Sequence, residues 1–440
     1  MPLRKSALAW LLGKEWREML ASRAWWFFLL LMGPLVGVSF ISAVTTYGEA
    51  SGLNGTSAGV GEAFSPLVGI WAPTFSACEL AAAFLLPFVA IRLFAGDRQS
   101  GALKLELQHR MSAFTRVAVK ALVLMFGWLI ALLAPLIGVF LWKLYGGSIY
   151  LPELLTVIFG HLLNAGVTIG LAATAAAITE HPATAAIVTL AITVGSWIIN
   201  FIAAVHGGWW ESVAGYTPTA MIAEFQRGLI RLDVVLIALA LISASLELAA
   251  VWLRLGIQVR RRVNESLAIV VVAAMVIFAS AWLRPSRDLS ENRMNSFSRA
   301  DEIALRQIQL PLHIEVHLAP EDPRRVDLER RALVKLRRVM PRLRVDYISA
   351  TSIGLFEQSS AGYGEIWYEM SGRRQTSRAT TPEAVLENIY ALARVTPPES
   401  NEDFRGHPLA AQPRGAAWIF YGVWPVLVVT TGFVMQRRQQ

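Results

Sequence analysis

Long apolar runs alternate with short polar connections along most of this chain. Eight of these runs reach the roughly 20 residues that a helix needs to cross a hydrocarbon core. The first seven follow one another closely, and a mostly polar block separates the seventh from the eighth. The runs cover residues 25–44, 73–93, 117–141, 154–178, 183–205, 234–253, 266–283 and 416–435. The pattern predicts an α-helical polytopic membrane protein.

The composition also indicates that most of the chain is embedded in a lipid bilayer. Of 440 residues, 55% are hydrophobic and only 16% are charged, and the mean hydropathy is +0.47. An ordinary soluble protein is more polar than this. The first run is full length and follows a charged segment, so we expect a retained anchor without a cleavable signal peptide. The single cysteine, Cys78, lies in the second run, which excludes a disulfide framework or a thiolate metal site within one chain.

Basic residues mark alternate connections between the runs. They are Arg4, Lys5, Lys14, Arg17 and Arg23 before the first run, Arg92, Arg98, Lys104, Arg110, Arg116 and Lys120 around the second connection, and Arg254, Arg260, Arg261 and Arg262 after the sixth run. The other connections are poor in Lys and Arg. The positive-inside rule therefore predicts that both termini are cytoplasmic and that residues 284–414 lie outside. Membrane topology accounts for the net charge of +8, and we expect no nucleic-acid partner.

The connections have distinct characters. Residues 1–24 interleave Trp and Leu with basic residues, as an interfacial helix does, and a plain charged tail is the alternative. Residues 46–72 are rich in Gly, Ser and Thr, which predicts an exposed loop. Residues 96–116 form an amphipathic cytoplasmic segment. Residues 206–232 are semi-apolar, but Gly and Pro interrupt them too often for a crossing, so they are expected to dip into the outer interface.

The polar block at 284–414 has the pattern of a small α/β domain. Apolar residues alternate from Leu312 to Leu318, which predicts a half-buried strand. A helix is expected at 324–340, a second strand at 345–348, and a hairpin of 365–370 and 373–378 around Ser371 and Gly372. A last helix at 382–393 would begin after Thr381. This order is compatible with a thioredoxin-like topology, and 396–414 reads as a linker to the last run.

Two cytoplasmic segments resemble parts of a known family. Gly13-Lys14-Glu15-Trp16-Arg17-Glu18-Met19-Leu20-Ala21-Ser22-Arg23 resembles the elbow helix of type-2 ABC exporter permeases. Asp97-Arg98-Gln99-Ser100-Gly101-Ala102-Leu103 resembles the coupling region of the same permeases, an acidic-x-x-x-Gly-Thr-Leu-Glu pattern that docks on the ATPase. Ala102 and Lys104 depart from that pattern. The resemblance implies that Asp97, Gly101, Leu103, Leu105 and Lys120 couple the chain to an ATPase.

The resemblance extends over the outer segments. Tyr216-Thr217-Pro218 and Phe225-Gln226-Arg227-Gly228-Leu229-Ile230 resemble the outer re-entrant hairpin before the sixth span. Arg287-Asp288-Leu289-Ser290-Glu291-Asn292-Arg293-Met294-Asn295-Ser296-Phe297-Ser298 is similar to the start of the auxiliary domain of gliding-motility-type ABC transporters. The chain then resembles a six-span permease core at 25–254, fused through two further spans to a shortened auxiliary domain at 284–414.

This resemblance implies a function. The chain would be the permease subunit of an ABC export complex in a bacterial cytoplasmic membrane, a homodimer driven by a separate ATPase that binds ATP and Mg. It would hold no cofactor and would not be an enzyme by itself. A partner protein on the outer face is also compatible with the domain. The alternatives are a non-transporting mechanical or scaffold complex and, third, a membrane enzyme, which the lack of a catalytic constellation disfavours.

Residues with catalytic or ligating chemistry are few. The segment Gly96-Asp97-Arg98-Gln99-Ser100-Gly101-Ala102 lacks the Lys that a phosphate loop needs after its second Gly. His313, Glu315 and His317 share a strand face, which suggests a metal, but a solvated face is the preferred interpretation. No Gly-x-Ser-x-Gly motif occurs in the outer block. We therefore predict no catalytic residue and no metal site.

Polar residues inside the apolar runs are the remaining candidates. A charged side chain at the bilayer centre costs roughly 2.5 to 3.5 kcal/mol on insertion scales, so such residues usually face the inside of a bundle. The candidates are Glu79, His161, Asn164, Asn200 and Glu247. Each could serve transport or gating, or simply join two helices by a hydrogen bond.

Overall fold

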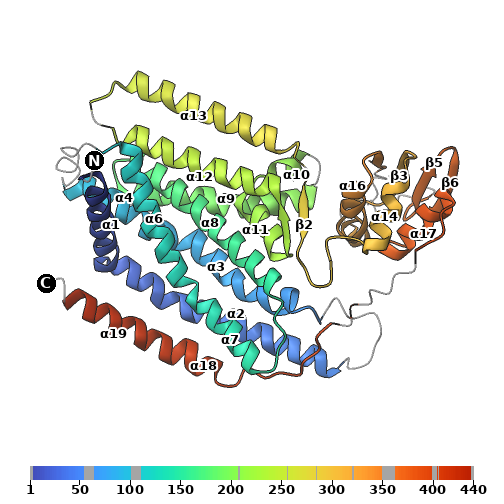
Figure 1. The fold of residues 1–440 in the computed structure, drawn as a ribbon, viewed down its shortest axis with the longest axis horizontal. Helices are drawn as coiled ribbons and strands as arrows, with labels where there is room; N and C mark the ends of the chain where they lie inside the picture. The colour runs from blue at the N-terminus through green and yellow to red at the C-terminus, as the bar shows by residue number, and fades with distance from the viewer. Residues whose placement is uncertain are drawn as a thin grey trace, which may run out of the picture. The chain divides into compact units, whose positions relative to one another are not determined.

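The computed structural model describes residues 3–53, 64–100, 111–206, 209–254, 256–283, 285–319, 322–348, 362–398, 404 and 406–437, without the side chains of 3–6, 97–100 and 211. The chain divides into two compact units (Figure 1). The first, the helical bundle, comprises Met1–Asn200, Val213–Leu289 and Arg405–Gln440. The second, the α/β unit, comprises Phe201–Ser212 and Ser290–Phe404. Each unit is described on its own.

Among the described residues, eight helical segments are long and apolar enough to cross a membrane, as a polytopic helical membrane protein requires. They are α2 (Arg23–Leu53); η2 (Leu67–Trp71) with α3 (Ala72–Phe84) and α4 (Leu86–Ser100); α6 (Ala113–Ala131) with α7 (Leu133–Leu144); α8 (Leu151–Ile178); α9 (Pro182–His206); α12 (Leu232–Trp252); α13 (Val259–Ser280); and α18 (Ala416–Trp418) with η4 (Ile419–Val423) and α19 (Trp424–Arg437). The predicted interfacial helix is α1 (Leu3–Ala21), which ends one residue before α2 begins. The N- and C-terminal ends of the bundle lie at the same end of it (Figure 1).

Helix α8 is the centre of the bundle, and α3, α4, α6 and α12 pack around it. Its small residues permit this close packing. A Cβ built on Gly166 would stand 2.8 Å from Ile242 Cδ1, and one on Gly170 would stand 2.9 Å from Ser245 Cβ. Thr174 also donates to the Ser245 carbonyl at 2.6 Å. The small-residue run thus sets the distance between α8 and α12.

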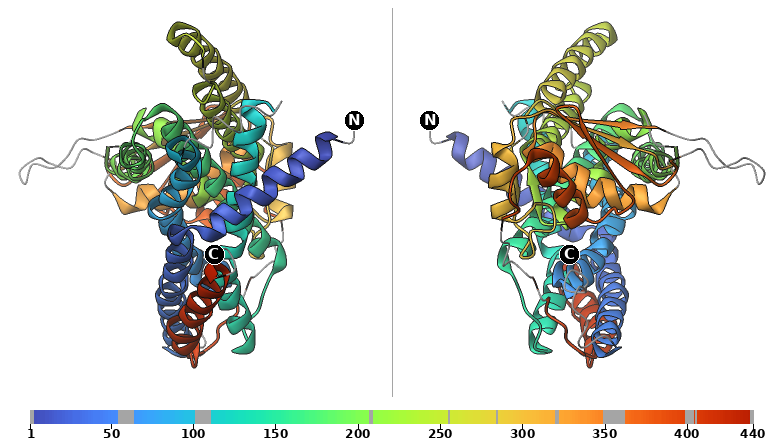
Figure 2. Two further views of the ribbon diagram at one scale, coloured as in Figure 1. Left: turned by 90° about the vertical axis from the view of Figure 1, so that its left-hand side faces the viewer. Right: turned by 90° about the vertical axis from the view of Figure 1, so that its right-hand side faces the viewer.

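The last span packs on the first. Gly33 and Gly37 form a flat strip on α2, and a Cβ on Gly37 would approach Phe420 Cβ to 2.6 Å. By contrast, α13 packs chiefly on α12, and almost none of its residues are buried. Figure 2 shows α13 standing away from the other spans of the bundle. The spans from α2 to α8 are thus the most buried part of the bundle, whereas α9, α13 and the final span are largely exposed.

Two connections at the far end of the bundle from the termini differ from expectation. The loop predicted at 46–72 was too long at both ends, because α2 continues to Leu53 and η2 begins at Leu67. Tyr47 holds this extension, since its hydroxyl lies 2.7 Å from the Phe64 carbonyl oxygen and 2.8 Å from that of His407, and can donate to either. The Gly- and Ser-rich composition did not reveal that these contacts come from distant parts of the chain.

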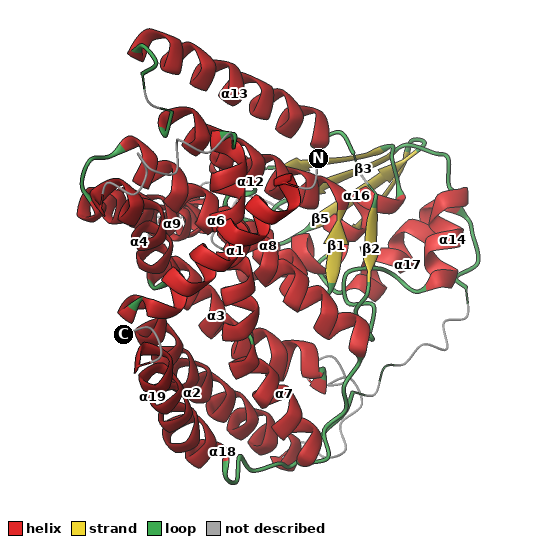
Figure 3. Cartoon of the chain, turned by 60° about the vertical axis from the view of Figure 1, so that its left-hand side comes forward, coloured by secondary structure: helices red, strands yellow, loops and turns green. Residues whose placement is uncertain are grey.

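The segment before the sixth span contains two short helices and a strand. They are α10 (Trp209–Ala214), α11 (Pro218–Gln226) and β1 (Leu229–Arg231). The strand pairs antiparallel with β2 (Ser286–Asp288), which directly precedes the α/β unit in sequence. Figure 3 shows β1 and β2 side by side at the end of the bundle. Short helices agree with an interrupted, non-crossing segment, but the sequence analysis did not anticipate the strand pair.

The α/β unit contains a four-stranded sheet with the order β4-β3-β5-β6. The strands are β3 (Leu312–Val316), β4 (Leu343–Tyr347), β5 (Ile366–Met370) and β6 (Arg373–Ser377). The pair β3–β4 is parallel, and the other pairs are antiparallel. Helices α14 (Arg299–Gln307), α15 (Pro323–Leu328), α16 (Val334–Val339) and α17 (Pro382–Ala393) complete the unit, with η3 (Glu329–Leu333) joining α15 to α16. All strands and helices that the sequence predicted in this block are present.

A single hydrophobic core holds the α/β unit together. Ile314 and Val316 of β3, Ile366 and Tyr368 of β5 and Leu336 of α16 are fully buried in it. Side chains alternate between the two faces along β3. Ile314 and Val316 therefore point into the core, and His313 and Glu315 lie on the opposite face. At the β5–β6 turn, Ser371 and Gly372 both have positive φ, of 50° and 76°, as a two-residue type I′ hairpin requires.

Candidate functional site

A mostly apolar groove with a few polar side chains lies on the surface of the helical bundle, between α2, α3, α9 and α11. It has a volume of about 650 Å³, and Glu79 and Asn200, two of the predicted intramembrane residues, both line it. Apolar residues of α2, among them Leu31, Leu35 and Val38, form the opposite wall. The structure therefore brings together two candidates that are far apart in sequence.

Glu79 is half-buried and accepts a hydrogen bond from the indole of Trp197. Trp197 Nε1 lies 3.2 Å from Glu79 Oε1. The side-chain amide of Gln226 also interacts with this carboxylate. Gln226 Nε2 is buried, but at ordinary hydrogen-bond geometry it has no partner among the described residues. The Glu79 carboxylate accepts one hydrogen bond from Trp197 and lines the groove, so it can accept a further hydrogen bond or pair with a cation there.

Asn200 serves a different purpose at the same groove. Its Nδ2 donates to Ser196 O at 2.7 Å and to Thr217 Oγ1 at 2.7 Å. The Thr217 hydroxyl also accepts from Ala220 N and so caps α11. Ser196 and Thr219 are joined by a further hydrogen bond between their hydroxyls. These contacts attach α11 to α9, so α11 forms a fixed end of the groove.

The other three intramembrane candidates lie elsewhere, and none of them lines the groove. His161 is fully buried against the Phe75 ring, with ring centroids 5.5 Å apart, and neither ring nitrogen has a partner among the described residues. Asn164 is half-buried on α8, and Glu247 is exposed on α12. Sequence analysis did not identify Trp197 and Gln226 as groove residues. Their neighbours in the sequence are ordinary, and only the fold brings their side chains to the Glu79 carboxylate.

At the end of the bundle that holds the termini, α1 is attached by an ion pair inside the protein. Lys120 Nζ lies 2.6 Å from Glu15 Oε2 and also donates to Leu93 O at 3.2 Å. The Glu15 side chain is fully buried, and the Lys120 side chain is 6% exposed. The ammonium of Lys120 thus holds α1 against α4 and α6, and its role in coupling to an ATPase stays a prediction.

The remaining coupling residues are only partly within the structure. Asp97 lies in the last turn of α4, where its side chain is not described. Gly101, Leu103 and Leu105 fall outside the described residues. Helix α6 begins after Ser112, whose hydroxyl accepts from Thr115 N at 3.0 Å. The ends of α4 and α6 therefore bracket the predicted coupling segment.

The polar sheet face of the α/β unit is occupied by its own ion pairs. His313 Nε2 lies 2.8 Å from Asp346 Oδ2, and His317 packs on the Trp367 ring with centroids 4.4 Å apart. The hydrogen bond from His313 and the charge of Arg344 lower the pKa of the Asp346 carboxyl. No group of three or more His, Cys, Asp or Glu side chains that could hold a metal occurs among the residues whose positions are described.

Comparison with protein-family models, with curated proteins and with solved structures found no match for this chain. The functional assignment therefore depends on the residues and geometry described above.

Proposed function

We propose that this chain is the membrane-spanning permease subunit of an ATP-driven export complex of the type-2 ABC class, powered by a separate cytoplasmic ATPase that binds ATP and Mg. The groove at Glu79 is the observation that carries this proposal. It combines an apolar wall with one carboxylate and lies on three spans and α11. A groove of this kind suits an amphiphilic substrate that passes between a membrane and an aqueous phase.

Helix α1 supports the mechanical part of the proposal. The Glu15–Lys120 pair joins α1 to α6, and the Leu93 carbonyl adds a contact to α4. The predicted coupling segment lies between α4 and α6 in the sequence. A push on that segment by an ATPase would therefore move α1, α4 and α6 together. We propose a homodimer in a bacterial cytoplasmic membrane, with both termini cytoplasmic and residues 284–414 outside.

A mechanical complex without transport is the second candidate, and the two connections to the α/β unit favour it. Before the unit, β2 pairs with β1, and Leu289 N donates to Gly228 O at 2.8 Å. After it, Leu409 N donates to Ser51 Oγ at 3.0 Å, and Arg414 O accepts from the Tyr145 hydroxyl at 2.9 Å. Movement of the bundle would reach both connections. The strand order supports a thioredoxin-like class for the unit, which would act on a protein partner outside.

The experiment compares ATPase docking with transport. The protein is co-expressed with candidate ABC ATPases from the same genome, and co-purified ATPase, basal hydrolysis and uptake into inverted vesicles are measured for Glu79→Gln and Leu103→Asp. We expect Leu103→Asp to abolish co-purification. Glu79→Gln should keep docking and hydrolysis but reduce transport about tenfold, because it removes the charge that faces the groove.

Ser76→Ala is the matched control, because Ser76 lines the same groove and its hydroxyl is engaged with the Pro73 carbonyl of its own helix. It should transport like the wild type. ATPase docking without any transport of candidate amphiphiles, together with loss of outer-partner recruitment on deletion of 292–405, would favour the mechanical complex. Failure to bind any ATPase would contradict both candidates.

A further inference from the structure

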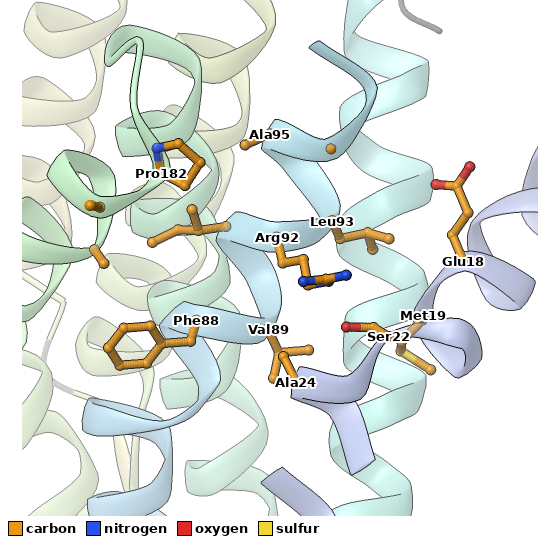
Figure 4. Close-up of a pocket in the computed structure, with 14 residues that line it drawn as sticks. Glu18, Met19, Ser22, Ala24, Phe88, Val89, Arg92, Leu93, Ala95 and Pro182 are labelled. Carbon is orange, nitrogen blue, oxygen red and sulfur yellow. The ribbon is translucent and has the colours of Figure 1, made fainter. Parts of the chain in front are cut away.

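A second cavity lies at the end of the bundle that holds the termini, enclosed by α1, α4 and the start of α9. Its volume is about 590 Å³. Figure 4 shows Arg92 and Ser22 pointing into it, with Phe88 and Val89 along one side and Pro182 on the far wall. The cavity thus combines polar groups at one end with an apolar lining, and it does not overlap the groove at Glu79.

Two polar groups of this cavity have no partner among the described residues. Arg92 is exposed, and it forms no ion pair with them. The hydroxyl of Ser22 is buried, with the residue only 8% exposed, and it too has no hydrogen-bond partner among the described residues. A buried hydroxyl without a partner is costly, which indicates that a ligand or solvent satisfies it.

The charge in the cavity favours an anion. Among the described residues, the carboxylate in its lining is that of Glu18, which pairs with Lys14 at 3.2 Å. Within the described part of the chain, the guanidinium of Arg92 is then a charge without compensation. Arginine binds phosphate through two parallel hydrogen bonds, and a hydroxyl such as that of Ser22 can donate a third.

We propose that this cavity binds the phosphate head group of a membrane phospholipid, with Arg92 and Ser22 holding the phosphate and Phe88, Val89 and Pro182 contacting the start of the acyl chains. The position of the cavity supports a lipid, because α1 has an interfacial composition and lies directly before the first span. A lipid bound there would lie between α1 and α4 and so would strengthen their attachment. The site does not depend on the transport proposal.

The test measures lipid binding to the purified, delipidated protein by native mass spectrometry. The probes are dioleoyl phosphatidylglycerol, dioleoylglycerol, which lacks the phosphate, and glycerol phosphate, which lacks the chains. We expect tight binding of one phosphatidylglycerol and weak binding of the other two. Arg92→Gln should weaken that binding roughly fivefold, since one basic group near anionic lipid contributes about that factor.

Two further variants make the result specific. Ala183→Trp fills the cavity from α9 without changing charge, and it should weaken lipid binding as Arg92→Gln does. Arg260→Gln removes an exposed arginine that does not line the cavity, and it should bind like the wild type. Equal lipid binding by wild type, Arg92→Gln and Ala183→Trp would overturn the proposal. Binding of glycerol phosphate as tight as that of the lipid would also overturn it and would indicate a site for a soluble phosphate.

Discussion

The indole of Trp424 packs directly on Gly33, so closely that a Cβ built on Gly33 would stand 2.1 Å from Trp424 Cδ1. The same indole donates its N–H to the Leu29 carbonyl at 2.8 Å. Any residue larger than glycine at position 33 would force this ring to move. The contact between the last span and the first therefore depends on the absence of one side chain.

This contact predicts the effect of adding a side chain. Gly33→Leu should destabilise the protein by about 1 to 3 kcal/mol or more, because an overpacked contact forces the helices apart. The measurement is the thermal stability of the detergent-solubilised protein by size-exclusion chromatography after heating. Gly195→Leu is the control, since a Cβ at Gly195 meets nothing within 4 Å. Equal stability of the two variants would show that α19 does not depend on α2.

The ion pair of Glu15 and Lys120 makes a second prediction. Glu15→Leu leaves the Lys120 ammonium inside the protein without its carboxylate, so it should cost about 3 to 5 kcal/mol. Lys120→Met should cost less, because Lys14 also pairs with Glu15 at 3.3 Å. The double substitution should recover most of that loss, because neither charge remains. Glu18→Gln should change stability by at most about 1 kcal/mol, because Glu18 is 41% exposed.

The measurement for this pair is a double-mutant cycle on thermal stability, with protease accessibility of α1 as a second readout. We expect α1 to become accessible in each single variant and to be protected again in the double one. Additive effects of the two substitutions would mean that the two side chains do not interact.

Disulfide formation can test the pairing of β1 and β2. Leu229 and Asp288 lie opposite each other in the register. The backbone hydrogen bond from Leu289 N to Gly228 O joins the neighbouring residues, so Leu229 and Asp288 form a non-hydrogen-bonded pair. The Cα atoms of such a pair lie close enough for a disulfide. In a Cys78→Ala background, Leu229→Cys with Asp288→Cys should cross-link on mild oxidation, as read by mass spectrometry of peptides.

The matched control moves one cysteine by a single residue. Leu229→Cys with Arg287→Cys should cross-link poorly, because adjacent strand residues point to opposite faces. Equal cross-linking in both variants would indicate that the strands slide and do not hold one register.

Acid should weaken the start of α15 in the α/β unit. Asp322 caps this helix by accepting from Arg324 N at 2.9 Å, and hydrogen bonds from Arg324 lower the pKa of Asp322 to about 2. A carboxyl whose pKa is lower when folded than its usual value near 3.9 contributes stability above that value. This contribution is lost as the pH falls from about 4 to about 2.

The measurement is limited digestion with pepsin across that pH range, followed by identification of cuts within 290–404. Asp322→Asn keeps a capping oxygen without the charge, so its stability should change less with pH. Asp322→Ala should also lose the cap, at a cost of about 1 kcal/mol at neutral pH. A wild-type domain equally resistant at both ends of the range would contradict the prediction.

Local patterns allowed prediction of many elements, although α14 was not predicted even though its cap, Ser298, is local. The period of hydrophobic residues located the eight spans, and Ser371-Gly372 located the β5–β6 hairpin, because only a few residue pairs adopt positive φ twice in succession. Thr381 located the start of α17, where its hydroxyl accepts from Ala384 N. In each case the deciding contact lies within a few residues.

Contacts between distant residues could not be predicted in this way. Trp197 and Glu79 are 118 residues apart, and Lys120 and Glu15 are 105 residues apart. Their pairing depends on helix packing, which no periodicity encodes. The strand β1 has only three residues, too few for an alternating pattern, and it forms because β2 returns to it. The sequence placed Lys120 at the end of the predicted coupling segment, but it could not show that its ammonium pairs with Glu15.

The packing of Trp424 against Gly33 also has a consequence for biosynthesis. Trp424 follows Leu29 by 395 residues, which a ribosome adds in roughly 20 to 80 seconds. During that time α2 is in the membrane without its partner, and its glycine strip is exposed to lipid or to the insertion machinery. The α/β unit must also leave the ribosome before the last span can close on α2. An arrested or truncated chain would therefore carry an open strip on α2, which is a surface that membrane quality control could recognise.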